Sequence, residues 1–183
     1  MSTPSPIADI RTTLATDRAA LRSAVDRVPA ELRQQKPAPD RWSVAEVLEH
    51  LGLVEGRVAM FFGPLLQDAP TLGADTQAGA TALDRTSLRN RDNKIAAPAP
   101  IQPTGSVSAE DAWTILQETR VKLLAMLDLA ETERRDLAQV RRQHPVLGPL
   151  DGYQWVAAIG GHEERHTLQI HEIADALESQ HLS

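Results

Sequence analysis

The chain has 183 residues and a formal net charge of −6, and 42% of its residues are apolar. This length predicts one domain, residues 1–183, with enough apolar residues for a core. The negative charge and the lack of a basic stripe argue against nucleic-acid binding, since phosphate backbones attract clustered Lys and Arg. Without cysteine there can be no disulfide, Fe–S ligation or thiol nucleophile, which fits a reducing cytoplasm. No apolar run reaches the ~20 residues that span a bilayer, and the N-terminus lacks the pattern of a signal peptide.

Four segments have apolar residues at helical spacing, and none shows strand-like alternation. After a short tail, residues 1–6, the first helix is expected from about Ile7 to Arg27. Ser43 predicts the N-cap of the second helix, with Glu46 three residues later completing a capping box. This helix is expected to fade near Gly63-Pro64 or just beyond.

Residues 67–108 are rich in Ala, Gly, Thr and Pro, which predicts a long crossover between the second and third helices. Arg85 to Lys94 could hold one helical turn within it. Ser108 is a second expected N-cap, for a third helix to about Leu127 or Leu129. Asp151 is expected to cap the last helix, about Gly152 to Ser179. The fold class predicted is all-α, a four-helix bundle with a long connection between helices 2 and 3, in which sites form between facing helices.

The stretch His162-Glu163-Glu164-Arg165-His166 is the main candidate for chemistry. Its two histidines lie one turn apart on one helix face, a spacing that can grip a divalent ion. His50, on or near the apolar face of the second helix, is the best third ligand; the alternative is a hydrogen-bonded core histidine. The stretch also matches the H-E-x-x-H string of zinc peptidases. Too few residues follow His166 for the third ligand of those enzymes, so the peptidase interpretation is rejected.

Two segments resemble the DinB/YfiT-like family. The run from Asp40 to His50 is similar to its W-S-x-x-E-x-L-x-H segment, and His144 to Leu150, Trp155 and His162 to Ile170 are similar to its closing block. The resemblance implies an up-down-down-up four-helix bundle and a metal site made of His50, His162 and His166. It also implies chemistry of the kind found in that family, which includes S-transferases that use low-molecular-weight thiols such as bacillithiol or mycothiol, and a mycothiol-dependent isomerase.

The functional prediction is therefore a metal-dependent enzyme with Zn²⁺ or Ni²⁺ at a three-histidine site. A bound metal would activate water or a thiol as a Lewis acid, in a transferase or hydrolase acting on a small molecule. Because the chain lacks cysteine, any thiol would come from a cosubstrate. The competing hypothesis is a non-catalytic, stress-associated bundle that binds partners or forms a homodimer.

Four further residues have two interpretations each. Glu163 is a candidate base or an arginine partner, and Arg165 a contact for an anionic substrate or a surface salt bridge. Glu46 and Gln169 are candidates for orienting the ligands. Their alternatives are helix capping for Glu46 and surface polarity for Gln169. Trp42 and Trp155 are expected to pack at the ends of the bundle rather than to line a substrate pocket.

Overall fold

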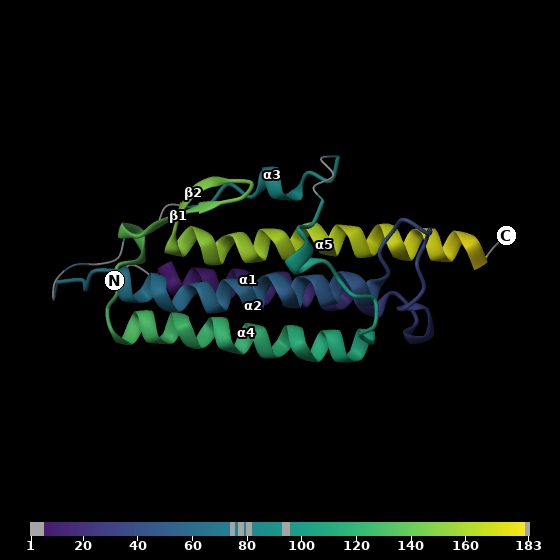
Figure 1. Ribbon diagram of the computed structural model, residues 1–183, viewed down its shortest axis with the longest axis horizontal. Helices are drawn as coiled ribbons and strands as arrows, with labels where there is room; N and C mark the ends of the chain where they lie inside the picture. Colours follow the sequence, from purple (N-terminus) through teal and green to yellow (C-terminus); the bar gives the residue numbers. More distant parts are fainter. Residues whose placement is uncertain (1–5, 74–75, 77–78, 80–81, 93–95, 182–183) are drawn as a thin grey trace.

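Four long helices dominate the computed structural model (Figure 1), which describes residues 6–73, 76, 79, 82–92 and 96–181. The expected tail, residues 1–6, lies outside the described residues except for Pro6, which begins the first helix. The long helices are α1 (Pro6–Asp26), α2 (Val44–Asp68), α4 (Ala109–Thr132) and α5 (Gly152–His181). The shorter elements are η1 (Ala30–Leu32), α3 (Thr86–Arg89), η2 (Ala99–Ile101), η3 (Leu137–Gln139), β1 (Arg141–His144) and β2 (Gly148–Asp151). The fold is therefore mostly helical, as predicted.

Side-chain caps fix where the helices begin. The Ser43 hydroxyl accepts a hydrogen bond from the Glu46 N–H at 3.2 Å, and the Glu46 carboxylate accepts one from the Ser43 N–H at 2.8 Å. Asp151 and Gln154 exchange the same pair of bonds at the start of α5, at 2.8 and 3.1 Å. The three expected caps, at Ser43, Ser108 and Asp151, are confirmed. Each satisfies N–H groups that have no partner within the first turn of a helix.

The long helices associate as two parallel pairs. Residue numbers rise together where α2 meets α4 and where α1 meets α5, while α2 and α5 run in opposite directions (Figure 1). The neighbours that establish this are Gly52 with Ile115, Gly56 with Thr119, Arg18 with Glu163, Arg27 with Asp175, His50 with His162, and Leu65 with Gly152. Leucines fill much of the space between the pairs, among them Leu14, Leu21, Leu48, Leu116, Leu123 and Leu127.

The expectation of no strands is wrong at one place. β1 and β2 pair antiparallel as a short hairpin, with Arg141 opposite Asp151 and His144 opposite Gly148. Each strand has only four residues, and β1 contains Arg, Arg, Gln and His, so the sequence has no apolar alternation that would predict a strand there. Gly148 has φ +76°, a conformation that glycine adopts without steric cost, next to the turn of the hairpin.

Helix α2 also continues past Pro64 to Asp68. A proline inside a helix removes one backbone hydrogen bond. Here the helix continues because Phe62, Leu65 and Leu66 are buried on the same face and hold it against the core. Among the described residues, no helix combines the length and apolar character needed to cross a membrane.

Candidate metal centre

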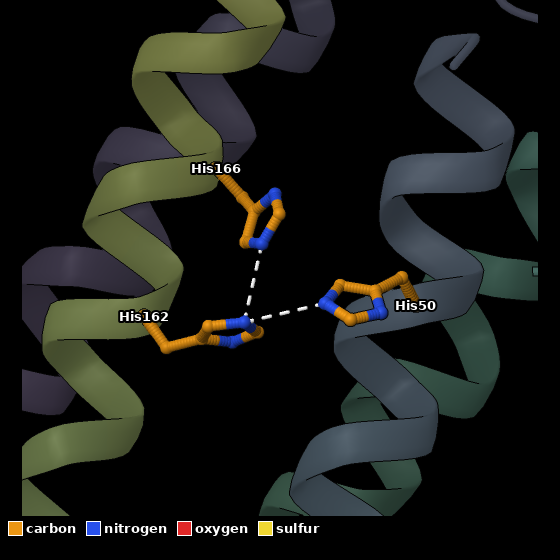
Figure 2. A group of neighbouring side chains, drawn as sticks. All are labelled: His50, His162 and His166. Atoms are coloured by element: carbon orange, nitrogen blue, oxygen red, sulfur yellow. Dashed lines mark hydrogen bonds between the residues drawn. The ribbon is translucent and has the colours of Figure 1, made fainter. Parts of the chain in front are cut away.

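The three predicted histidines meet between α2 and α5. Figure 2 shows His162 and His166 projecting from α5 toward His50 on α2. The Nε2 atom of His162 lies 3.3 Å from Nε2 of His50 and 3.1 Å from Nε2 of His166. Within the described part of the chain, these residues form a group whose ligand atoms all lie within 4.8 Å of one another. Residues far apart in the sequence therefore present three ring nitrogens to one point.

Contacts on the outer side of two rings decide which nitrogen carries the proton. His50 Nδ1 lies 2.6 Å from the carbonyl oxygen of Ile101, and a carbonyl can only accept, so Nδ1–H donates. His166 Nδ1 lies 2.8 Å from Gln169 Oε1, which also accepts from Arg91 Nη1 at 3.4 Å, so Nδ1–H donates here too. The Nε2 lone pairs of both rings consequently face His162. Such outer contacts are the usual way in which proteins orient histidine ligands.

The donor set fits a divalent metal ion. Three nitrogens bound tetrahedrally at ~2.0–2.1 Å from one ion would lie ~3.3 Å apart, close to the two Nε2 separations. Without a cation, His162 could donate a proton from Nε2 to only one of its two neighbours, so the Nε2 lone pair of the other neighbour would have no donor. Neutral imidazole nitrogen is a ligand for zinc and nickel alike.

The protonation states agree with this assignment. Burial is the main cause that lowers the pKa of His162, to about 3, and the neighbouring His50 adds to the effect. Burial, followed by the neighbouring rings of His162 and His50, holds the pKa of His166 well below its ordinary value. Burial also lowers the pKa of His50, against the opposing effect of its bond to Ile101. All three rings are therefore neutral near pH 7, the form that binds metal.

A cavity of about 520 Å³ adjoins the triad, and all three histidines line it. Trp42 and Trp155 line it as well, so the expectation that they pack only at the ends of the bundle is wrong. The ring centroid of Trp42 lies 5.0 Å from that of His50 and 6.3 Å from that of His166. Trp155 packs against Phe61 and His144, at centroid distances of 5.1 and 4.8 Å. The volume lies in the range of ~300–1,000 Å³ that is typical of small-molecule sites.

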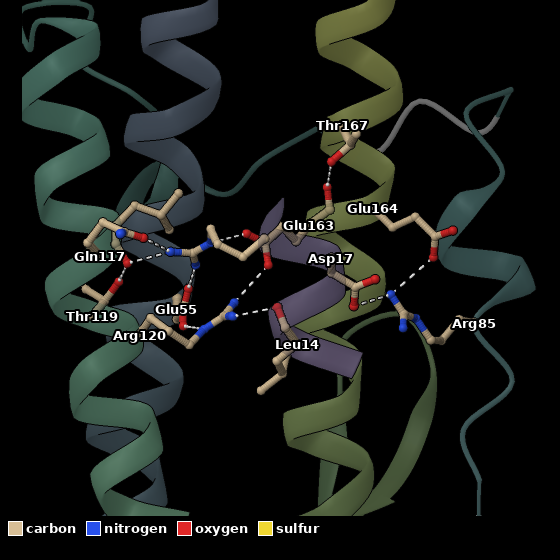
Figure 3. Close-up of polar contacts among 12 residues, drawn as sticks. Leu14, Asp17, Glu55, Arg85, Gln117, Thr119, Arg120, Glu163, Glu164 and Thr167 are labelled. Carbon is tan, nitrogen blue, oxygen red and sulfur yellow. Dashed lines mark hydrogen bonds and ion pairs between the residues drawn. The ribbon is translucent and has the colours of Figure 1, made fainter. Parts of the chain in front are cut away.

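Glu163 does not line this cavity but lies in the bundle interior (Figure 3). Its carboxylate, only 2% exposed, accepts hydrogen bonds from Arg18 and, at 2.8 Å, from Arg120. The same two arginines bind Glu55, at 2.9 and 2.5 Å. Each long helix contributes one member of this buried charge cluster, defined as Arg18, Glu55, Arg120 and Glu163. Of the two interpretations of Glu163, the geometry favours an arginine partner over a base that faces a metal.

The other members of the buried charge cluster were not identified from the sequence, although a signal was present. Arg18 lies four residues after Leu14, and Glu55 and Arg120 lie four residues after Leu51 and Leu116. Each charged residue therefore occupies the apolar stripe of its helix, where it is buried with the leucines. Charged residues on separate stripes predict mutual pairing, because unpaired burial is costly.

The structure places the three remaining candidates, Gln169, Glu46 and Arg165, in different surroundings. Gln169 contacts His166, one of the three candidate ligands, as one interpretation predicted. Glu46 instead caps α2 and pairs with Lys36 at 2.8 Å. Arg165 lines the cavity, and its guanidinium donates to the backbone carbonyls of Leu88, at 3.2 Å, and Asn90.

Comparisons with known proteins place the chain in a family. The family model described as the DinB superfamily matches residues 13–170, a range that contains the three histidines. The chain is 31% identical over 149 residues to the uncharacterized protein YuaE of Bacillus subtilis (strain 168). That match covers 81% of this chain and 86% of YuaE. No solved structure matches significantly. With a matching family model over most of its length and a bundle of the expected helices, the chain belongs to the DinB superfamily.

Proposed function

We propose that His50, His162 and His166 hold one divalent metal ion, Zn²⁺ or Ni²⁺, and that the protein is a metal-dependent enzyme acting on a small molecule in the adjoining cavity. The observation that carries this proposal is the convergence of three neutral imidazoles, with Nε2 lone pairs turned inward, at the wall of that cavity. Three protein ligands are also typical of catalytic zinc sites, whereas structural zinc sites usually have four.

When bound, such an ion supplies Lewis-acid activation of water or of a thiol. The chain's own residues hold and orient the site. The Ile101 carbonyl and Gln169 fix two ligand rings, and the apolar wall, including Trp155 and Ile159, keeps water away from the reacting molecule.

The reaction that we propose is transfer to or from a low-molecular-weight thiol, with a hydrolase activity as the neighbouring possibility. Its support is the resemblance to thiol-dependent members of the family, together with the lack of cysteine, which leaves the thiol to a cosubstrate. We also assign to the bundle the family's up-down-down-up order, supported by the parallel pairing of α1 with α5 and of α2 with α4.

Metal analysis of freshly purified protein tests the proposal. We expect about one zinc or nickel per chain, and loss of that metal in His50→Ala, His162→Ala and His166→Ala. The matched control is His171→Ala, because His171 is on α5 but outside the triad. If the wild-type protein holds no metal and binds neither Zn²⁺ nor Ni²⁺ on addition, the proposal fails. A thiol-transfer assay with a panel of electrophiles then tests the reaction class on the metal-loaded protein.

A second candidate function is a non-catalytic module that binds partners or forms a homodimer. It is favoured by exposed apolar side chains on α2 and α4, among them Met60 (72% exposed) and Val121 (67% exposed). This candidate predicts that the histidine variants keep the wild-type oligomeric state and stability. Light scattering of wild-type and His162→Ala protein, beside the metal analysis, separates the two candidates.

A further inference from the structure

The cavity beside the three histidines combines an apolar wall with cationic side chains. Its described lining includes the apolar residues Val54, Val58, Trp155 and Ile159. Arg41, Arg91 and Arg165 line it as well, and Asp40 contributes the one carboxylate among the described lining residues. An apolar surface with a cationic end is complementary to a molecule with an apolar body and an anionic group.

Two of these arginines lie at the end of the cavity where the histidines are. Arg91 donates to Gln169 Oε1 at 3.4 Å, the oxygen that also accepts from the ligand His166 at 2.8 Å. Arg165 lies between His162 and His166 on α5, and its guanidinium donates to the carbonyl oxygens of Leu88 and Asn90. These bonds orient the Arg165 guanidinium at the cavity wall.

The charges of Arg91 and Arg165 also act on each other. Both guanidinium groups are cationic and line the same cavity, so they repel each other. Glu172 pairs with Arg91 at 2.6 Å and with Arg41 at 3.0 Å, so it is shared between two arginines. A bound anion would relieve this repulsion, and an ionised acceptor for a guanidinium is among the strong hydrogen-bond partners.

If the proposed function is correct, a bound metal ion would also favour a negatively charged ligand in this cavity. Three neutral imidazoles leave the double positive charge of a divalent ion uncompensated. Sites of this kind favour an anionic partner at the open position, because burial of uncompensated charge costs free energy.

We propose that the cavity selects a small organic carboxylate with an apolar body, whose carboxylate lies toward Arg91 and Arg165 and whose body packs against Val54, Val58, Trp155 and Ile159. Arg91 and Arg165 are then specificity-determining residues. A molecule of the same shape without the negative charge is a poor ligand.

Binding of two matched probes to the full chain tests this assignment. Octanoate and octanamide have the same apolar body and differ in charge. Calorimetry gives their affinities, and fluorescence of the cavity tryptophans reports the site. We expect octanoate to bind at least about tenfold more tightly than octanamide, because an ionised acceptor makes stronger hydrogen bonds to a guanidinium than a neutral amide does. Arg91→Gln and Arg165→Gln should each reduce this preference, and Arg165→Lys, which keeps the charge, should retain most of it.

The control is Arg22→Gln, because Arg22 pairs with Asp26 on α1 and does not line the cavity. Equal affinity for the two probes, or no binding of either, overturns the assignment. So does an octanoate preference that survives in the Arg91→Gln, Arg165→Gln double variant, because the anion would then bind elsewhere.

Each measurement is made on zinc-loaded and on metal-free protein, alongside the metal content. An arginine-dependent preference in a chain that binds no metal would support the carboxylate site and refute the metal-dependent enzyme. One bound metal per chain without a preference for octanoate would support the metal site and refute the carboxylate site. The two failures are therefore distinguishable.

Discussion

Replacing Glu163 with glutamine should destabilise the protein far more than the same change at the next residue. The buried charge cluster contains two arginines and two glutamates, so its formal charges cancel. Glu163→Gln leaves one positive charge uncompensated in the core and turns an amide N–H₂ group toward a guanidinium. Removing one partner of a buried ion pair costs about 3–5 kcal/mol. That is a large part of the ~5–15 kcal/mol that keeps a typical domain folded.

Glu164→Gln is the matched control. The Glu164 side chain is 24% exposed and pairs with Arg85 at 3.1 Å and with Arg89, which is 58% exposed. An ion pair that water reaches contributes at most about 1 kcal/mol. Urea denaturation followed by circular dichroism should therefore show a large drop in the midpoint for Glu163→Gln and a small one for Glu164→Gln, with similar slopes. Equal losses in the two variants would refute the argument from buried charge.

The same variant also tests whether Glu163 belongs to the metal site. Its carboxylate is held by Arg18 and Arg120 and does not line the cavity. Folded Glu163→Gln protein should therefore retain the wild-type metal content. Adding Arg120→Met removes the excess positive charge, so the double variant should recover part of the lost stability. Loss of metal from the folded single variant would place Glu163 in the site after all.

Two further predictions concern the histidines. Gln169→Leu should weaken metal binding roughly 10–100-fold, because it removes the acceptor that orients His166. Competition with a chelator measures the affinity for the metal. The control, Gln180→Leu at an exposed position on the same helix, should leave that affinity unchanged. Metal-free protein should lose stability as the pH falls below 6.5, because burial lowers the pKa of His162 to about 3 in the folded state and the unfolded chain then binds the extra proton. This contribution is complete above pH 6.5 and declines toward pH 3 by up to about 1.4 kcal/mol per pH unit for each such histidine. Urea denaturation between pH 7 and pH 4.5 should show a shallower decline for His162→Asn than for the wild type, and equal slopes would contradict the assignment.

The three histidines that meet in the structure could be predicted because their signal lies in side chains. His162 and His166 share a helix face, and His50 interrupts an apolar stripe that would otherwise have no reason to contain it. The acceptor that orients His50 could not be predicted, since it is the main-chain carbonyl of Ile101. Every residue has such a group, so only the path of the crossover decides which one reaches the ring.

The fold also has parts that the sequence pattern predicts and parts that it does not. Helices of 21 to 30 residues repeat their apolar pattern often enough to be recognised. The β1–β2 hairpin has too few residues for a pattern, and only Leu150 and Asp151 of its strands are buried. The positions of Trp42 and Trp155 were misjudged for a related reason. A tryptophan beside a helix can pack inside the bundle or face a cavity, and the choice depends on neighbours that come from the distant crossover and hairpin.

The cavity is built from two kinds of segment, the long helices and the connection between α2 and α4. The three histidines lie on long helices, whereas Arg91, Ala97 and Ile101 line the cavity from the connection between α2 and α4. Side-chain changes in that connection can reshape the cavity without replacing a histidine, provided that they keep the path of the main chain at Ile101, whose carbonyl accepts from His50. Connections from related bundles could therefore be grafted onto this one, and the resulting variants, all with the same three histidines, could be compared for the small molecules that they bind.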